Sequence, residues 1–522
     1  MADSGFLPLT RSIRDPIHGT IYLSDEEIHI IDHRLFRRLH RIKQNGLLYY
    51  VFPSATHSRF EHSLGVLHVA HTAFHSLIRN SQVAKEKTDP AVIDREDASA
   101  GQAIRFDKLG DGLLTDLLRI TRLAALVHDL GHGPFSHTFD SFAPKRSSLI
   151  EAIEETELGI DSLISYLQKE DRKDKEKKGK DYSRVDHEEM SCYLFAIIWK
   201  DISEREKLKF HHDEIEEIPR LVAATILGDP DIANGTKLAE HVRLLNDLVA
   251  SAPVDADRMD YLERDSRSVG VTYGLYDRQR LMKSFLVYKS AEEAPNGESY
   301  LRLGIKRSGL RAVENFVQAR FELFVQIYYH KTNRAVSFML DRIAKLADDA
   351  GLDVTQLHPG LSLDELYEVL SDERFFRILL DEDANLRFDG IDDLVQIAKR
   401  IERRDLWKRI FEASKQENDL VYQELKESEG GDEIENDAID PKATKGLGKG
   451  GRLLRRMGEK GVYQVDDEKE DGWLKASPMM NALKEEEEKI SRIYFVGSDS
   501  HTKSELRKNA RQISQDLDTD ES

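Results

Sequence analysis

The chain of 522 residues holds a single cysteine, Cys192, so it can form no internal disulfide and no cysteine-based zinc cluster. This cysteine lies in the apolar stretch MSCYLFAII, where we interpret it as a small core residue, and its isolation indicates a reducing compartment. No N-terminal signal pattern precedes Arg11, and no apolar run approaches the roughly 18 residues of a membrane-spanning helix. We therefore expect a cytoplasmic protein without membrane contact.

Positive charge is also scarce, since 76 lysines and arginines stand against 96 aspartates and glutamates, which gives a net charge of −20. Such a chain repels nucleic-acid backbones as a whole, so nucleic-acid binding is not its expected role. Any anionic ligand must meet a local basic pocket.

Apolar residues recur at helical spacing through most of the chain up to residue 347, which predicts a mainly α fold with one large helical core. Short β signals interrupt the helices at TIYLS (20–24), at YYVFP (49–53) and in a hairpin whose turn is Pro-Asn-Gly at 295–297. The strands should be appendages on a helical body.

The composition changes after residue 347, and this change suggests how the rest of the chain is divided. We expect a smaller helical C-terminal lobe over 348–427 and a Gly-, Lys- and Asp-rich linker or arm over 428–472. A helix and the lone strand RIYFV should occupy 473–508, and 509–522 should be a disordered acidic tail. The motif GLGKGG in the arm follows no strand and lacks P-loop spacing, so we assign it no phosphate-binding role.

The stretch LAALVHDLGHGPFSHTFD, residues 123–140, places three histidines and two aspartates directly after an apolar run that should be buried. Burying His128 and Asp129 is costly unless something compensates for their polarity, and a bound metal would do so. Adjacent side chains on a helix point about 100° apart, so both reach one ion only where the helix ends. Gly131 and Gly133 supply that ending.

Two further ligands are needed, and the sequence offers one on each side of this stretch. SRFEHSLGV carries His62 and APVDADRMDYLERD carries Asp257, each at the edge of an apolar helix. Any one of these histidines, taken alone, is more often structural. Together, His62, His128, Asp129 and Asp257 form a mixed imidazole and carboxylate set that suits one divalent transition metal, Fe, Mn, Zn or Co, with positions open for water.

The order H…HD…D resembles the signature of the HD hydrolase superfamily. The chain is similar to its deoxynucleoside triphosphate triphosphohydrolase (dNTPase) branch, which includes bacterial dGTPases and the SAM- and HD-domain dNTPase of vertebrates. The similarity rests on DPIHGTIYL, IKQNGLLYYVFPSATHSRFEHSLGV, HDLGHGPFSH, DADRMDYLERD and YYHK, in family order over roughly residues 11–345.

The resemblance implies an HD-type phosphohydrolase core over 1–347 that splits dNTPs into deoxynucleoside and inorganic triphosphate. It also implies Mg with the triphosphate, a possible nucleotide activator, and a homo-oligomer, often a tetramer. The transition metal would lower the pKa of a bound water to about 7, which gives a hydroxide that attacks the α-phosphorus.

Roles for individual residues follow from the same resemblance. It implies that His137 is the general acid for the leaving 5′ oxygen, with Asp140 and His187 as orienting partners. The implied substrate-binding positions are Gln44 and Asp265 at the 3′ hydroxyl, Tyr328 and Tyr261 at the deoxyribose, His132 at the α-phosphate, and Arg59, Arg258, Arg320 and Lys331 at the triphosphate.

The sequence departs from the family at positions that contact the deoxyribose and at positions that bind the activating nucleotide. Asn45 stands where the vertebrate enzyme has a leucine that helps to close the 2′ side, and Phe324 stands where it has a histidine one turn before the aromatic residue. The region that binds an activating guanine nucleotide keeps Asp32. Its other contact positions hold Arg14, Arg37 and His40, which argues against guanine-specific activation.

Two other functions stay open at the level of the sequence. One is another HD nucleotide phosphohydrolase, acting on monophosphates or on guanosine tetraphosphate-type signals, although the implied triphosphate-binding arginines argue against it. The other is a nucleotide-sensing subunit of a defence complex, which the long C-terminal arm with RIYFV motivates. The identity of the products and the turnover of the isolated chain distinguish the three.

Overall fold

A computed structural model provides the coordinates of the protein. The residues that it describes are 6–86, 101–178, 183–204, 212–251, 253–293, 299–358, 360–383, 392–413, 415–428, 430, 433–438, 453–457, 462–465, 477–479, 482–483 and 491–520.

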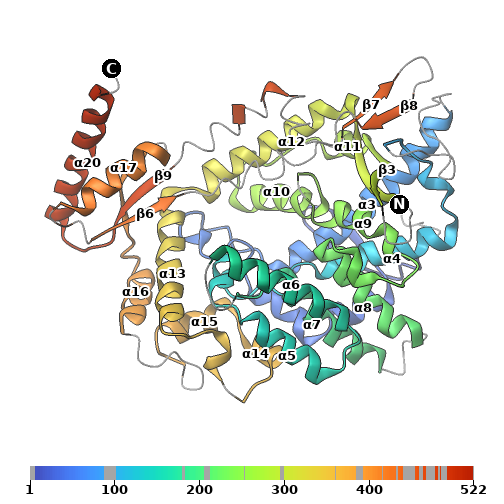
Figure 1. The fold of residues 1–522 in the computed structure, drawn as a ribbon, viewed down its shortest axis with the longest axis horizontal. Helices are drawn as coiled ribbons and strands as arrows, with labels where there is room; N and C mark the ends of the chain where they lie inside the picture. The colour runs from blue at the N-terminus through green and yellow to red at the C-terminus, as the bar shows by residue number, and fades with distance from the viewer. Residues whose placement is uncertain are drawn as a thin grey trace.

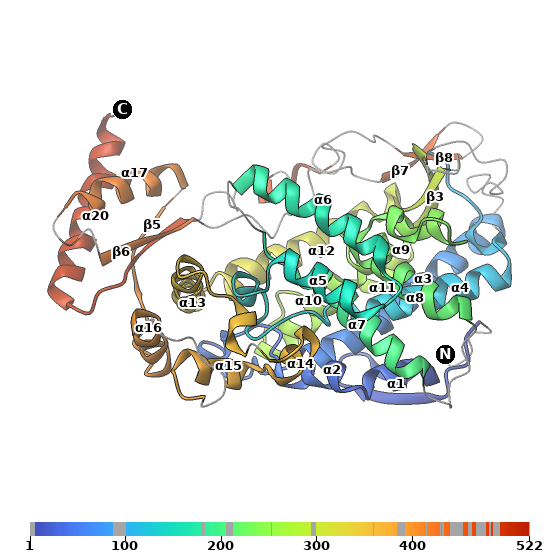
Figure 2. The ribbon, with the colours of Figure 1, turned by 60° about the horizontal axis from the view of Figure 1, so that its bottom comes forward.

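The body of the molecule is a set of packed helices built around α3 (Arg59–Glu86), which confirms the predicted mainly α fold. α4 (Asp111–Val127) and α10 (Ala256–Val269) pack against α3. α8 (His212–Leu227) packs against both α4 and α7 (His187–Ser203). Figures 1 and 2 show these helices together in the larger part of the molecule.

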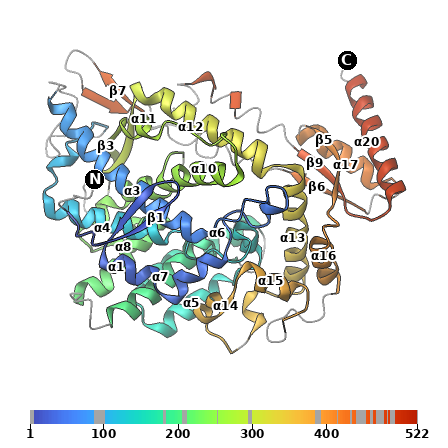
Figure 3. The ribbon, with the colours of Figure 1, turned by 180° about the vertical axis from the view of Figure 1, so that it is seen from behind.

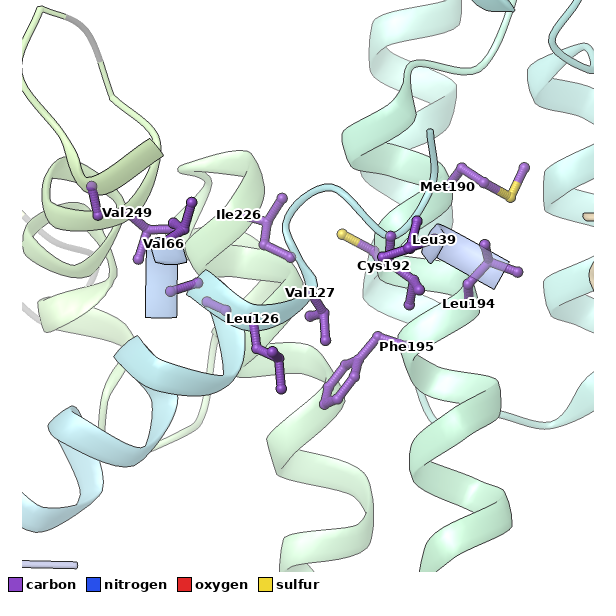
Figure 4. Packing of buried hydrophobic residues seen from close by; sticks show 14 of the residues in the cluster. Leu39, Val66, Leu126, Val127, Met190, Cys192, Leu194, Phe195, Ile226 and Val249 are labelled. Carbon is purple, nitrogen blue, oxygen red and sulfur yellow. The ribbon is translucent and has the colours of Figure 1, made fainter. Parts of the chain in front are cut away.

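A continuous apolar core lies between these helices. Leu126 and Val127, the last apolar residues of α4, are fully buried, and Figure 4 shows them near Phe195 of α7 and Ile226 of α8. Cys192 is buried in the same cluster, which confirms its interpretation as a core residue. Each large apolar side chain buried in this way contributes roughly 1.5 to 3 kcal/mol. The packing of Leu126 and Val127 in this core therefore fixes the position of the end of α4, which His128 directly follows.

The strands form small sheets at the edges of this body. β1 (Arg11–Asp15) pairs antiparallel with β2 (Gly19–Leu23), which matches the β signal at TIYLS. β3 (Phe285–Glu293) pairs antiparallel with β4 (Ser299–Lys306), so the second predicted hairpin is present, although its turn at 295–297 lies outside the described residues.

The strand expected at YYVFP is absent, and the chain there forms a 3-10 turn, η2 (Leu48–Tyr50). Gly46 has a φ of +49°, and the main-chain bonds that follow close locally, from Leu48 N to Asn45 O at 3.0 Å and from Phe52 N to Leu48 O at 3.0 Å. These local bonds use the groups that a strand would need for pairing.

The region expected to form a helical lobe contains α14 (Leu363–Val369), α15 (Asp372–Leu379) and α16 (Asp392–Glu402). It follows α13 (Lys331–Asp349), the last helix before the predicted boundary, and α16 packs against both α13 and α15. Figure 1 shows α13, α15 and α16 side by side at one end of the body. The lobe is therefore joined to the core by extensive packing.

A small terminal unit projects beyond this lobe. Its sheet has the strand order β5 (Lys408–Ala413), β9 (Ser491–Phe495), β6 (Ile434–Ala438), so RIYFV is a central strand and the predicted arm contributes an edge strand. α17 (Lys415–Lys426) and α20 (Ser500–Asp520) pack on this sheet, and Figures 1 and 3 show them apart from the body.

Two expectations for the C-terminal region need correction. The arm over 428–472 also supplies β7 (Leu453–Met457) and β8 (Val462–Val465), which extend the β3–β4 sheet; GLGKGG lies outside the described residues. The tail from residue 509, expected to be disordered, continues α20 to Asp520. The apolar residues on one face of α20 recur every three or four positions and pack on the small sheet. They are Leu506, Ala510, Ile513 and Leu517.

Among the helices of the described part of the chain, none is both long and apolar enough to cross a membrane.

Candidate metal centre and substrate site

The four predicted metal ligands meet at the ends of three helices. His62 lies in the first turn of α3, His128 and Asp129 follow the last residue of α4, and Asp257 lies in the first turn of α10. Nε2 of His62 is 3.1 Å from Asp257 and 3.3 Å from Asp129, and Nε2 of His128 is 3.4 Å from Asp129 and 3.8 Å from Asp257. The Asp257 side chain is 25% exposed and opens the centre to solvent.

The close approach of α7 requires a glycine just after Asp129. A Cβ on Gly131 would lie 2.1 Å from the carbonyl oxygen of His187 and 2.5 Å from the amide nitrogen of Ser191. The Ser191 hydroxyl accepts from Gly131 N at 2.7 Å and donates to His128 O at 2.7 Å. The predicted helix ending is therefore present, and it brings the start of α7 against the metal-binding loop.

These four residues fit a divalent cation. Nδ1 of His128 bonds to the carbonyl oxygen of Ala125 at 2.9 Å, whereas its buried Nε2 has no hydrogen-bond partner among the described residues. Burial opposes a charge on His62, but Asp129, Asp257 and Asp260 outweigh burial and raise the pKa of its imidazole well above the usual range. A cation would satisfy the orphaned nitrogen and neutralise the gathered carboxylates.

The outer nitrogen of His62 is held by a carboxylate that the sequence analysis did not single out. Nδ1 of His62 is 2.8 Å from Asp260, which is completely buried and also bonds to Nε of Arg264 at 2.8 Å and to Nε2 of His18 at 2.5 Å. α3 approaches closely here, since a Cβ on Gly65 would lie 1.9 Å from Asp260. A carboxylate on the outer nitrogen of a metal-binding histidine fixes the ring and its tautomer.

Arg59, expected at the triphosphate, lies directly beside the metal centre. Its guanidinium donates to Asp129, to the Ser136 hydroxyl at 3.1 Å and to the carbonyl oxygen of Gln44 at 3.3 Å. It is 4% exposed. Arg59 therefore ties the metal-binding loop to the segment that carries Gln44.

The expected catalytic residues His137, Asp140 and His187 form a cluster with His132 next to the candidate metal centre. His132 stacks on His187 with ring centroids 3.8 Å apart, and His137 lies edge-on at 4.8 Å from His132. Nδ1 of His137 is 3.6 Å from Asp140, and the His137 side chain is 64% exposed. The ligand atoms of these four residues lie within 4.8 Å of one another, which would also allow them to bind a cation.

His132 connects the cluster to the metal centre. Its Nε2 is 3.4 Å from Asp129, and the side chain is fully buried. Burial, with the charges of Arg59 and His187, lowers the pKa of His132 well below its usual range. The imidazole is therefore neutral near pH 7.

Two of the expected sugar-binding residues, Tyr328 and Asp265, bond to each other. Tyr328 donates its hydroxyl to one Asp265 oxygen, and His57 bonds to the other at 2.7 Å. Burial works against the Asp265 charge, but the bonds from His57 and Tyr328 lower its pKa. Gln44 is 7% exposed, and its side-chain carbonyl has no hydrogen-bond partner among the described residues. An acceptor without a partner is available for a ligand hydroxyl.

A second basic group lies where α10 begins. Arg258 donates to Asp255, the N-cap residue of α10. Arg320, near the end of α12 (Leu310–Leu323), is 4% exposed with its guanidinium 5.4 Å above the Phe324 ring, and its charge acts on Asp255 and Tyr261. Two of the expected triphosphate-binding cations are thus near Asp257.

Lys331 is more peripheral than the other expected phosphate ligands, since it is the exposed first residue of α13. The chain between Arg320 and Lys331 is not one continuous α-helix. A π-helical turn, η9 (Phe324–Tyr328), separates α12 from α13. Such turns are frequent at functional sites.

Sequence reasoning missed Asp260, His57, Ser136 and Asp372. Asp260 follows Asp257 by three residues on α10, so helical spacing could have identified it. Ser136 lies within HDLGHGPFSH and His57 within IKQNGLLYYVFPSATHSRFEHSLGV, but neither residue has a chemical signature of its own. Asp372 accepts bonds from two distant loops, and no local pattern indicates this.

Comparison with known proteins gives distant relatives, and no protein-family model matches the chain. The chain is 27% identical over 400 residues to the uncharacterised protein MJ1154 of Methanocaldococcus jannaschii, covering 76% of this chain and 59% of that protein. It is 27% identical over 415 residues to the deoxynucleoside triphosphate triphosphohydrolase SAMHD1 of Homo sapiens, covering 77% and 55%. Protein L394 of Acanthamoeba polyphaga mimivirus, whose name is "Putative HD domain-containing protein L394", is 26% identical over 334 residues, covering 64% and 57%.

The chain thus spans less than three fifths of the length of these relatives. Among solved structures, a hypothetical protein of Aquifex aeolicus has a TM-score of 0.58 at 22% identity, covering 96% of this chain and 99% of that one. This likeness concerns the fold. The named relatives support the predicted distant relationship to the HD-domain dNTPase family.

Proposed function

We propose that the chain is a metal-dependent dNTP triphosphohydrolase that releases deoxynucleoside and inorganic triphosphate. The observation that carries the proposal is the convergence of His62, His128, Asp129 and Asp257 beside a histidine cluster and buried arginines. Distant relatives named as dNTP triphosphohydrolases and HD-domain proteins support the same chemistry.

The four ligands would hold a divalent transition metal, Fe, Mn, Zn or Co. When bound, such a metal supplies Lewis acidity that makes water a nucleophile near neutral pH. Asp260 bonds to Nδ1 of His62, so Nε2 of His62 faces the other three ligands. Arg59 fixes one oxygen of Asp129 and brings positive charge beside the position proposed for the α-phosphate.

His137 would act as the general acid. Its Nδ1 faces Asp140, so Nε2 is the atom that would deliver a proton to the leaving 5′ oxygen. His187 lies edge-on to His137 at 5.2 Å and limits its orientation. His132, neutral and buried, would donate a hydrogen bond to the α-phosphate.

Arg258, Arg320 and Lys331 would bind the triphosphate, with Mg as a counter-ion of the substrate. The net charge of −20 repels an anionic substrate, and these local positive charges would attract it to the site. Gln44 and Asp265 would bind the 3′ hydroxyl, and Tyr328 with Tyr261 would pack on the deoxyribose.

The proposal includes a homo-oligomer in a cytoplasmic setting, and it leaves two cases for activation, a nucleotide activator that is not guanine-specific or no activator. The homo-oligomer follows from the family relationship, and the two cases for activation follow from Arg14, Arg37 and His40 at the activator positions. Size-exclusion chromatography with and without each dNTP measures the subunit number. A mass that stays that of a monomer under all conditions rejects the oligomer.

The test is to incubate the purified chain with each dNTP, alone and in mixtures, with Mn or Mg, and to separate the products by ion-exchange chromatography. We expect deoxynucleoside and triphosphate in equal amounts. His128→Ala should abolish turnover together with metal content, whereas His501→Ala, on the exposed face of α20, should match the unmodified protein. Release of phosphate or pyrophosphate would indicate another HD phosphohydrolase.

A further inference from the structure

Asp372, the first residue of α15, bridges two loops of the substrate site. Its Oδ2 accepts from the amide of Lys43 at 2.8 Å, and its Oδ1 accepts from the amide of Phe135 at 2.8 Å. Asp372 is only 5% exposed. Lys43 precedes Gln44, and Phe135 lies two residues before His137. One buried carboxylate of the C-terminal lobe thus holds a sugar-binding segment and a catalytic segment together.

The segment that begins at Phe135 needs such support. Phe135 and Ser136 have φ values of +61° and +57°, a left-handed conformation that is costly for residues with a Cβ. Two consecutive residues of this kind persist only where neighbouring groups fix them. The Asp372 bond fixes the first, and the Ser136 hydroxyl, which donates to the carbonyl oxygen of Lys43 at 2.8 Å, fixes the second.

α15 also packs on this segment through aromatic rings. Phe375 lies 5.3 Å from Phe139 and 5.1 Å from Phe142, and Phe376 lies 6.1 Å from Phe135. Such aromatic pairs add stabilisation beyond the area they bury, so they hold the start of α15 against this segment. The carboxylate of Asp372 is therefore held at a fixed position relative to both loops.

We propose that Asp372 is a positioning residue that sets the placement of His137 relative to Gln44, so that the C-terminal lobe completes the catalytic site. This inference rests on the proposed function of the site. Asp372 lies behind the loops and acts through main-chain amides. It touches neither the metal ligands nor the position proposed for the substrate.

The test compares Asp372→Asn with Glu373→Gln in the full-length chain. Asparagine keeps the shape of the side chain but can accept from only one of the two amides with its oxygen, and its NH2 group faces the other donor. Glu373, the next residue, is exposed and pairs with Arg377 at 3.0 Å, so its change removes a carboxylate from the same helix without touching either loop.

Hydrogen exchange of the Lys43 and Phe135 amides is the first readout. In Asp372→Asn we expect at least one of them to exchange about tenfold faster or more, because a buried donor loses its acceptor. The Gly131 amide, which bonds to Ser191, should keep its rate. In the same variant kcat should fall while bound metal stays unchanged, and Glu373→Gln should match the unmodified chain in every respect.

Unchanged exchange at both Lys43 and Phe135 would overturn the proposal, as would equal acceleration at Gly131, which would indicate general destabilisation. A kcat that stays unchanged despite faster local exchange would also overturn it. If the unmodified chain hydrolyses no dNTP while the exchange rates shift as expected, the bridge between the loops exists and the proposed function fails. The two ideas are thus tested separately.

Discussion

Replacing Asp260 with asparagine should weaken metal binding without removing any metal ligand. Asp260 is completely buried and bonds at once to His62, His18 and Arg264. An asparagine oxygen can still accept one of these bonds, but the negative charge that fixes the tautomer of His62 is lost. Carboxylates in this position are typically worth about 10- to 100-fold in metal affinity, or roughly 1.4 to 2.8 kcal/mol.

The same substitution should also lower the free energy of unfolding. Breaking a buried charge pair costs about 3 to 5 kcal/mol when the remaining charge has no partner. Arg264 keeps a bond to Asp15 at 3.0 Å, so we expect a value near or below the lower end of that range. A loss of stability alone could weaken metal binding, and a matched control is therefore needed.

Asp15→Asn is that control. Asp15 is 4% exposed and binds Arg264 through one oxygen, while its other oxygen accepts from the amides of Ile17 and His18. The asparagine oxygen can keep the amide bonds, but the NH2 group then faces Arg264 and cannot accept from its guanidinium, so both the charge and the acceptor beside Arg264 are lost. This variant should destabilise the same network and leave the bond between Asp260 and His62 intact.

The assay is competition with a chelator of known affinity, followed by direct measurement of bound metal, with urea unfolding of the metal-free protein as the measure of stability. We expect Asp260→Asn to bind the metal 10- to 100-fold more weakly, and Asp15→Asn to bind it as the unmodified chain does. Equal metal affinities for the two variants would refute the reasoning.

His137→Asn should slow turnover by about 10²- to 10⁴-fold while bound metal stays unchanged, and loss of the metal would contradict the division of roles. The unmodified chain should prefer dNTP to NTP at the lower end of a roughly 5- to 150-fold range, set by one buried hydroxyl without a partner. Tyr328→Ala should reduce this preference and Asn45→Leu should sharpen it in competition assays with matched dNTP and NTP pairs; equal hydrolysis by the unmodified chain would show that the site does not read the sugar. Burial, with the charge of Arg122, lowers the pKa of His71 to about 2 from 6.5, so the unfolded chain binds the extra proton below pH 6.5. His71 alone should therefore lower the free energy of unfolding by about 1.4 kcal/mol per pH unit as pH drops below 6.5, and His71→Gln should remove this contribution in urea titrations at pH 7 and 5.

The meeting of the four candidate metal ligands could be predicted because the segments that carry them have local signals. The apolar run before His128 indicated a buried helix, and the glycines after Asp129 indicated where that helix ends. His62 and Asp257 sit at the edges of other apolar helices, and their motifs occur in the order of a known family. The structure then brings the four together within hydrogen-bonding or ion-pairing reach.

The supporting contacts could not be predicted in the same way. Asp372 accepts from amides 329 and 237 residues away in the sequence, and a single sequence gives no sign of such pairing. The segment YYVFP has the composition of a strand, but local turn bonds after Gly46 use the groups that a strand would pair. The acidic composition of the tail suggested disorder, although its apolar residues have helical spacing. They form one face of α20 because the small sheet packs against that face.

The bond that is cleaved tests the central claim most directly. Hydrolysis of a single dNTP in ¹⁸O-labelled water, followed by phosphorus NMR and mass spectrometry, identifies both products and the oxygen that water donates. The account predicts inorganic triphosphate that carries one ¹⁸O atom, together with unlabelled deoxynucleoside, because the attack is at the α-phosphorus and the 5′ oxygen leaves. Monophosphate with pyrophosphate, or label in the deoxynucleoside, would contradict it.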